Sequence, residues 1–275
     1  RIWPRFPDNV LLFKLANAAC LSAAAIFACR FARDRLRLPT SVALGATLPG
    51  TATTPALYLS SMLLSEPLFL ALLLPLLIHA ERATAEDIGD GGWREPAILG
   101  ACAGGLALVR SHGIAMVAAI ALAYAMRRRW REAGLVLVVA VLVVAPWQLW
   151  IAMNDSAIPP ALHGDYGSYT SWLFEGLRTR GAGFLIETVR ANATSILGVI
   201  ASRLRPAGAP WLSIPAGAAV LVLAAAGCAR LARTARVMLA FVASYLVIVL
   251  VWPFPPSRFV LGIWVVLMLL LAAGA

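Results

Sequence analysis

The sequence predicts an all-α, polytopic transmembrane helix bundle, and three observations support that prediction. Hydrophobic residues make up 61% of the 275 residues and charged residues only 13%, whereas a soluble domain is about half apolar and about a quarter charged. The mean hydropathy is +0.83. Long apolar segments alternate with short arginine-rich clusters, as the spans and loops of polytopic proteins do. We expect one transmembrane domain over residues 1–275.

Nine segments are apolar enough to cross a membrane, because a transmembrane helix needs about 20 mostly apolar residues. Helices are expected because the backbone N–H and C=O groups of a segment in lipid must form hydrogen bonds within that segment. The run "LVLVVAVLVVA" at 135–145 lacks the alternation of a membrane β-strand. The expected spans are 10–29, 40–58, 62–80, 97–110, 113–126, 133–152, 212–229, 237–252 and 259–275.

The net charge of +10 would suit a nucleic-acid-binding protein, but the distribution of the arginines excludes that class. Thirteen basic residues fall in alternate short turns, which the positive-inside rule assigns to the cytoplasm. Arginine greatly outnumbers lysine, and alanine and leucine are abundant, which suggests a GC-rich bacterial genome. We therefore expect a multi-pass protein of the bacterial inner membrane. The basic turns are 30–38, 81–96, 127–132 and 230–236.

Two further patterns concern packing rather than chemistry. The four cysteines lie in apolar segments without CxxC spacing, as small packing residues do. The run "GACAGGLAL" at 100–108 places small residues together, which is typical of closely packed membrane helices. No nucleotide-binding loop or hydrolase motif occurs in the sequence.

Glu66 is a carboxylate inside the apolar stretch "YLSSMLLSEPLFLALLLPLLIHA" at 58–80. Ionisable residues at membrane depth cost a few kcal/mol and are usually functional or paired. The predicted topology places Glu66 at the outer start of the third span, with Ser65 suited to the N-cap and Pro67 to the first turn. Two interpretations stay open: an acid that only stabilises the helix start, or a carboxylate that binds a sugar, a metal ion or an attacking group.

Three other polar residues are expected on the same outer face. Arg110 and His112 flank the break between the fourth and fifth spans, and Arg258 opens the last span. Each arginine either extends to lipid headgroups or binds a phosphate of the substrate. His112 is either an interfacial polar residue or a substrate contact.

The outer segment 153–211 is too long for a simple connection. We expect an extracytoplasmic loop that contains an interfacial helix over about 184–204, where apolar residues recur at helical spacing. The stretch "HGDYGSYTSW" at 163–172 carries groups that bind sugars, with Tyr166 as a candidate substrate contact. His163 and Asp165 could bind a metal ion, but a third ligand is missing nearby.

The order of several motifs resembles the GT-C superfamily of membrane glycosyltransferases over essentially the whole chain. The motifs are "PRFPDNVLLFKLANA", "LYLSSMLLSEPLFLALLL", "LALVRSHGIAMV", "RRRW", "APWQLW" and "PPSRFVLGIWVVLM". The closest similarity is to bacterial relatives of the protein O-mannosyltransferases and of the aminoarabinose transferases of lipid A. These motifs are typical of the superfamily in combination, and none is decisive alone.

The resemblance implies transfer of a sugar from a polyprenyl-phosphate donor to a lipid, glycan or protein acceptor on the extracytoplasmic face, usually with inversion. In such enzymes a carboxylate deprotonates the acceptor hydroxyl, and cationic groups or a divalent cation stabilise the leaving phosphate. Glu66 matches the family's second acidic position, which contacts a metal ion or the substrate. The family's principal catalytic aspartate lies in the first outer loop, upstream of residue 1, and Asp8 does not fit its motif. We therefore expect a fragment that is inactive alone.

Two alternative classes remain. A transporter or lipid flippase would place ionisable residues near the middle of the bilayer and would show broken helices in repeated halves. A non-catalytic membrane scaffold would leave the polar outer face unexplained. Glu66, Arg110 and Arg258 around one outer cavity would favour the enzyme.

Overall fold

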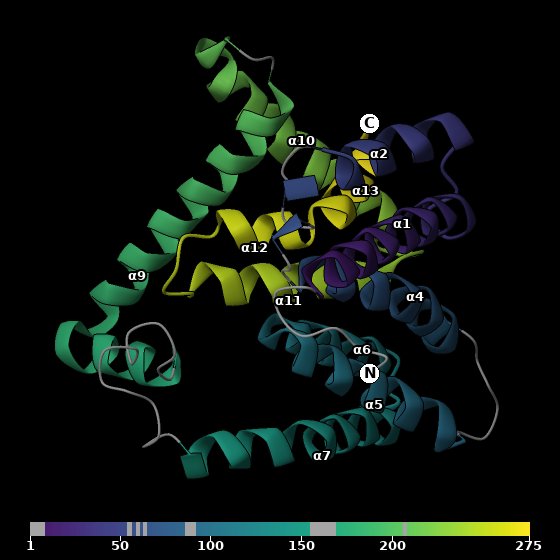
Figure 1. Ribbon diagram of the computed structural model, residues 1–275, viewed down its shortest axis with the longest axis vertical. Helices are drawn as coiled ribbons and strands as arrows, with labels where there is room; N and C mark the ends of the chain where they lie inside the picture. Colours follow the sequence, from purple (N-terminus) through teal and green to yellow (C-terminus); the bar gives the residue numbers. More distant parts are fainter. Residues whose placement is uncertain are drawn as a thin grey trace.

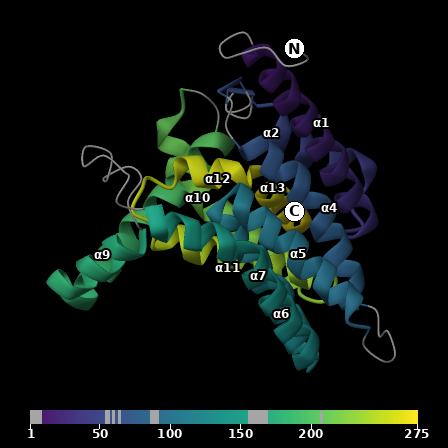
Figure 2. The same cartoon turned by 60° about the horizontal axis from the view of Figure 1, so that its bottom comes forward.

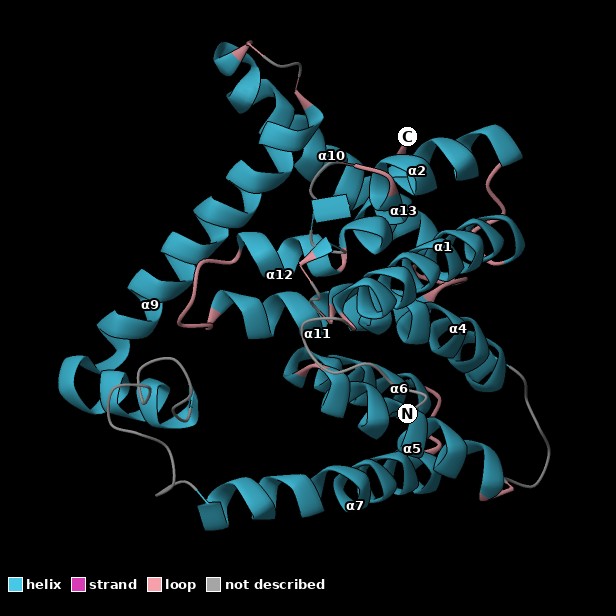
Figure 3. Cartoon of the chain, viewed as in Figure 1, coloured by secondary structure: helices cyan, strands magenta, loops and turns pink. Residues whose placement is uncertain are grey.

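The computed structural model describes residues 9–53, 57–58, 61–62, 65–85, 92–154, 169–205 and 208–275, and over these residues it contains helices and no strand (Figures 1 and 3). The all-α prediction is therefore confirmed. Two short 3-10 turns, Ser111–Gly113 and Pro210–Leu212, interrupt the α-helices. The α-helices are α1 (Val10–Asp34), α2 (Thr40–Thr51), α4 (Glu66–Ala85), α5 (Arg94–Val109), α6 (Ile114–Met126), α7 (Trp130–Asn154), α9 (Tyr169–Leu204), α10 (Ser213–Leu231), α11 (Arg236–Leu250), α12 (Ser257–Gly262) and α13 (Trp264–Gly274).

Five helices in the described residues are long and apolar enough to cross a membrane, which supports a membrane protein without confirming nine spans. They are α1, α4, α7, most of α9, and α10 together with the turn before it. The second expected span contains the 12-residue α2, which has Pro49 near its end. The last expected span is divided at Ile263, where the backbone leaves the helical conformation between α12 and α13.

The long outer segment contains more helix than its sequence suggests. Instead of a helix over 184–204, the structure has the 36-residue α9, which Gly181 interrupts with a φ of 62°. Glycine adopts this left-handed conformation without steric cost. Figures 1 and 2 show α9 along one edge of the molecule, where it packs against α10, α11 and α12. Its position at a membrane surface stays a prediction.

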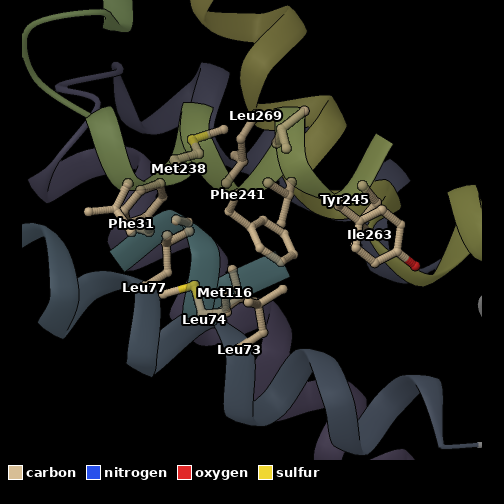
Figure 4. Packing of buried hydrophobic residues seen from close by; sticks show 14 of the residues in the cluster. Phe31, Leu73, Leu74, Leu77, Met116, Met238, Phe241, Tyr245, Ile263 and Leu269 are labelled. Carbon is tan, nitrogen blue, oxygen red and sulfur yellow. The ribbon is translucent and has the colours of Figure 1, made fainter. Parts of the chain in front are cut away.

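The hydrophobic core lies where α4 and α11 meet α1, α6 and α13. Figure 4 shows leucines of α4 facing Phe241 of α11 and Met116 of α6, while Met238 of α11 lies nearer Leu269. Between membrane helices, side chains of this kind stabilise the fold by close van der Waals packing. The labelled core residues are Phe31, Leu73, Leu74, Leu77, Met116, Met238, Phe241, Tyr245, Ile263 and Leu269.

The close packing predicted for 100–108 is confirmed, because α5 lies directly against α7. A Cβ atom on Gly100 would lie 2.7 Å from the carbonyl oxygen of Val136, and one on Gly104 would lie 3.1 Å from that of Ala140. Glycine therefore sets the distance between the two helix backbones. Because α5 ends at Val109, the packing of α5 against α7 also fixes the position of the next residue, Arg110.

Two buried side chains tie α11 to neighbouring helices. The carboxylate oxygen Oε1 of Glu81, on α4, accepts a hydrogen bond of 2.8 Å from the backbone amide of Met238 in the first turn of α11. Amides in a first turn lack partners within their own helix. Near the other end of α11, the hydroxyl of Tyr245 donates to the carbonyl oxygen of Phe259 at 2.9 Å. These bonds fix α11 relative to α4 and α12.

Candidate functional site

Glu66 is the first residue of α4 and is almost completely buried, with 2% of its surface exposed. The carbonyl oxygen of Ser65 accepts a hydrogen bond of 2.8 Å from the amide of Phe69, so Ser65 occupies the N-cap position that the sequence predicts. The start of a helix favours a negative charge. The helix start alone does not account for the surroundings of Glu66, because two arginines contact the carboxylate.

Oxygen Oε1 of Glu66 lies 2.7 Å from Nη1 of Arg110 and 2.7 Å from Nε of Arg258. The contact with Arg258 is a hydrogen bond, whereas Arg110 Nη1 lies within ion-pair distance without the direction of a hydrogen bond. The side chain of Arg110 is buried and that of Arg258 is 50% exposed. The three side chains carry a net charge of +1.

The backbone explains how Arg110 reaches Glu66. After α5, Arg110 is extended, with φ −149° and ψ 131°, and the turn Ser111–Gly113 then reverses the chain into α6. The turn is tight, because a Cβ atom on Gly113 would lie 2.6 Å from the backbone of Leu106. Arg258 reaches Glu66 from the first turn of α12, directly after the proline-rich stretch 253–256.

A cavity of about 590 Å³ opens beside this ion-pair cluster. Its wall combines two arginines with three serine residues, a histidine and three aromatic rings, and the described lining residues include no acid. Such a wall can bind an anion and hydroxyl groups while it stacks against an apolar face. The lining residues are Ser65, Val109, Arg110, Ser111, His112, Trp252, Phe254, Pro255, Ser257, Arg258 and Phe259.

His112 lies among aromatic rings in the wall of this cavity. Its ring centroid is 4.3 Å from that of Trp252, 4.6 Å from that of Phe259 and 5.3 Å from that of Tyr245. In the described part of the chain, Nε2 of His112 and Oε2 of Glu66 are buried without a hydrogen-bond partner. Buried polar atoms normally have a partner, so both atoms can still bind a ligand group or a water molecule.

An apolar groove of about 330 Å³ lies between α9, α10, α11 and α13. Leu250 lines this groove and Trp252, two residues later, lines the cavity. The two hollows are thus lined by residues two positions apart in the chain, at and just after the end of α11. The groove residues are Ala193, Ile196, Leu197, Ile200, Val220, Leu221, Ala224, Val242, Leu246, Leu250, Leu267, Leu270 and Leu271.

The structure brings together four of the five candidate site residues, namely Glu66, Arg110, His112 and Arg258. The fifth, Tyr166, lies outside the described residues, as do His163 and Asp165. Sequence reasoning missed the aromatic wall at Trp252 and Phe259. The stretch "WPFPPSRF" was the available signal, because its aromatic residues flank Arg258 closely in the sequence.

The described residues do not provide a site suited to a metal ion. Within them, no group of three or more His, Cys, Asp and Glu side chains lies close enough to hold one. Glu66 is the single carboxylate of the described cluster, and two guanidinium groups already contact its Oε1 atom. Two adjacent positive charges disfavour a cation at that atom.

Comparisons with models of known protein families, with curated proteins and with solved structures give no match. The interpretation of the site therefore depends on its geometry and on the motifs of the sequence.

Proposed function

We propose that the chain is an integral-membrane glycosyltransferase that transfers a sugar from a polyprenyl-phosphate donor to an acceptor on the extracytoplasmic face of the bacterial inner membrane. The observation that carries the proposal is the cluster of Glu66, Arg110 and Arg258 beside a cavity rich in hydroxyl and aromatic groups. The resemblance of the sequence motifs to the GT-C superfamily supports the same reaction. The acceptor is a lipid, glycan or protein hydroxyl.

In this proposal the two arginines bind the phosphate of the donor. Arg258 is half exposed and lines the cavity, so it can turn from Glu66 to a phosphate oxygen. Arg110 also lines the cavity but is buried, and it keeps the carboxylate neutralised. Positive charge that is already in place stabilises the negative charge that develops on a leaving phosphate.

The remaining surfaces suit the other parts of such a donor. Hydroxyl groups of Ser65, Ser111 and Ser257 can bond to sugar hydroxyls, and the aromatic rings can stack on the apolar face of a sugar. The apolar groove follows α11 from Leu250 to Val242, a length of about 12 Å at the helical rise. A hydrocarbon chain attached to a phosphate in the cavity can lie along it.

Glu66 then acts by positioning the arginines. Its Oε1 atom contacts both guanidinium groups, so we do not assign it the removal of the acceptor proton. A divalent cation stays a prediction from the family resemblance, and we assign it no step because the described residues do not suit one.

The test measures transfer of radiolabelled sugar in membranes that contain the full-length gene product, with a panel of polyprenyl-phosphate sugars as donors. We expect wild-type activity from one donor and a loss of at least about 100-fold in Glu66→Gln, because misplaced charge-stabilising groups cost about 10²–10³-fold in rate. Glu187→Gln is the matched control, since Glu187 is exposed on α9 and lies 4.0 Å from its arginine partner.

A second variant separates the role of the site from the stability of the fold. Arg258 is half exposed, so Arg258→Gln should remain folded and should raise the KM for the donor. Equal activity of folded Glu66→Gln and wild type would reduce Glu66 to a stabiliser of the helix start. Absence of transfer from every donor, together with movement of a labelled polyprenyl phosphate across vesicles, would support the alternative of a transporter or flippase.

A further inference from the structure

Asn192 is a buried polar residue of α9 that contacts the backbone of Leu250, which lines the groove, and of Trp252, which lines the cavity. It is 9% exposed, and the next residue, Ala193, lines the groove. Burying an amide is unfavourable unless it forms hydrogen bonds. The partners of Asn192 therefore show what it holds in place.

The side-chain nitrogen Nδ2 of Asn192 lies within hydrogen-bond distance of three carbonyl oxygens at the end of α11. The distances are 3.2 Å to Val249, 3.0 Å to Leu250 and 2.9 Å to Trp252. The last carbonyls of a helix have no partner within their own helix. An amide nitrogen carries two hydrogens, so the three oxygens share them. A side chain of α9 thus closes the end of α11.

This contact determines where the aromatic wall of the cavity begins. The backbone bonds that continue α11 are long, 3.2 Å from the amide of Val251 to Ile248 and 3.3 Å from the amide of Trp252 to Val249. The bond from Asn192 to the carbonyl of Trp252 is shorter. The ring of Trp252 lies 4.3 Å from that of His112, which follows Arg110 by two residues in the turn. A shift of the Trp252 backbone therefore changes the wall that faces the cationic groups.

We infer that Asn192 is a positioning residue that holds the end of α11 and keeps the Trp252 wall of the cavity closed against His112. The effect of Asn192 on catalysis rests on the proposed function, whereas its positioning role does not. Under that function, Trp252 lines the cavity that binds the sugar phosphate of the donor, so loss of Asn192 should weaken donor binding more than it slows the chemical step.

A labelling experiment tests the positioning role without any transferase assay. The four native cysteines are replaced by alanine, and a single cysteine is introduced as Ser257→Cys in the wall that follows Trp252. The rate of modification by a charged, water-soluble thiol reagent then reports how open the wall is. Ser65→Cys, which lines the same cavity directly before α4, provides the reference rate.

Asn192→Asp keeps the shape of the side chain but removes its hydrogen-bond donors. We expect it to raise the labelling rate of Ser257→Cys by about 5- to 30-fold, the factor that corresponds to one or two kcal/mol, while Ser65→Cys changes less than twofold. The matched control is Asn154→Asp, because Asn154 is exposed and its side-chain nitrogen donates within its own helix, to the carbonyl oxygen of Trp150. Asn192→Ser, which retains one hydroxyl donor, replaces Asn192→Asp if that variant does not fold and should give an intermediate rate.

Equal labelling of Ser257→Cys in the folded Asn192 variants and the parent would overturn the inference. Where transferase activity is present, the same variants should raise the KM for the donor about fivefold or more with little change in kcat. If labelling is faster but the KM for the donor is unchanged, Asn192 positions the wall without affecting donor binding, and the predicted effect on the donor is wrong. Faster labelling in a protein without transferase activity would leave the positioning role intact and refute the proposed function instead.

Discussion

Replacing glycines of α5 by alanine tests whether close helix contact positions Arg110. A Cβ atom on Gly100 would lie 2.7 Å from the carbonyl oxygen of Val136, whereas ordinary contact begins at 3.4 Å. The two backbones must therefore separate by about 0.7 Å, and overpacking of this kind typically costs about 1–3 kcal/mol. Gly104→Ala should be milder, because its nearest atoms would lie at 3.0 and 3.1 Å.

The neighbouring Gly105 provides a matched control in the same helix, because a Cβ atom there would meet nothing within 4 Å. Alanine is favoured over glycine in a helix interior by about 1 kcal/mol, so Gly105→Ala should be neutral or stabilising. Gly100→Ala should be destabilising. The same replacement of glycine by alanine is thus expected to lower the stability of the protein at position 100 and to leave it unchanged or raise it at position 105, five residues away.

Thermal unfolding of the purified protein in one detergent, followed by circular dichroism, measures the difference. We expect the Tm of Gly100→Ala to fall below that of Gly105→Ala by several degrees, at about 2–4 °C per kcal/mol for a chain of this size. Transfer activity should fall further in Gly100→Ala than its Tm suggests, because α5 leads directly into Arg110. A Gly100→Ala protein as stable as Gly105→Ala would falsify the close contact between α5 and α7.

Three further substitutions test contacts between helices. Tyr245→Phe removes the hydrogen bond to the carbonyl of Phe259 and should lower the free energy of unfolding by about 1 kcal/mol, as denaturant titration can measure. Glu81→Ala leaves the amide of Met238 without its acceptor, and a loss of about 1–3 kcal/mol is expected in the same titration; an unchanged midpoint would contradict this role. Gly227→Ala would drive a Cβ atom into the carbonyl oxygen of Leu270 on α13, so we expect poor recovery of folded protein on size exclusion, while Gly198→Ala, with open space around it, should be recovered normally.

Hydropathy was sufficient to predict the helical class but not the continuity of each helix. The residues around Ile263 are apolar on both sides, so composition places one span where the structure has α12 and α13. Whether an apolar run continues as one helix depends on what it packs against. The helix start at Glu66 was easier to predict, because Ser65 and Pro67 provide local signals that act within one turn.

The site shows a similar division between local signals and tertiary contacts. Membrane topology predicted that Glu66, Arg110 and Arg258 share one face, because like ends of spans lie on the same side of a bilayer. The topology could not show that both arginines contact one carboxylate oxygen. Asn192 and Glu81 were missed for the same reason: each is polar in the sequence, and only the packing of α9 and α4 against α11 shows that they are buried.

Stability alone does not explain why the chain keeps charges at Glu66 and Arg110. Removing charges from water costs several kcal/mol per ion, and replacing a buried ion pair by well-packed apolar side chains is often neutral or stabilising. Here the cost is raised further, because Oε2 of Glu66 lacks a partner in the described residues. Within the described part of the chain, the two arginines of this cluster line the cavity and outnumber its one carboxylate, so an anion that enters the cavity is attracted. The charge imbalance therefore favours a site built for a phosphate over one that only joins three helices.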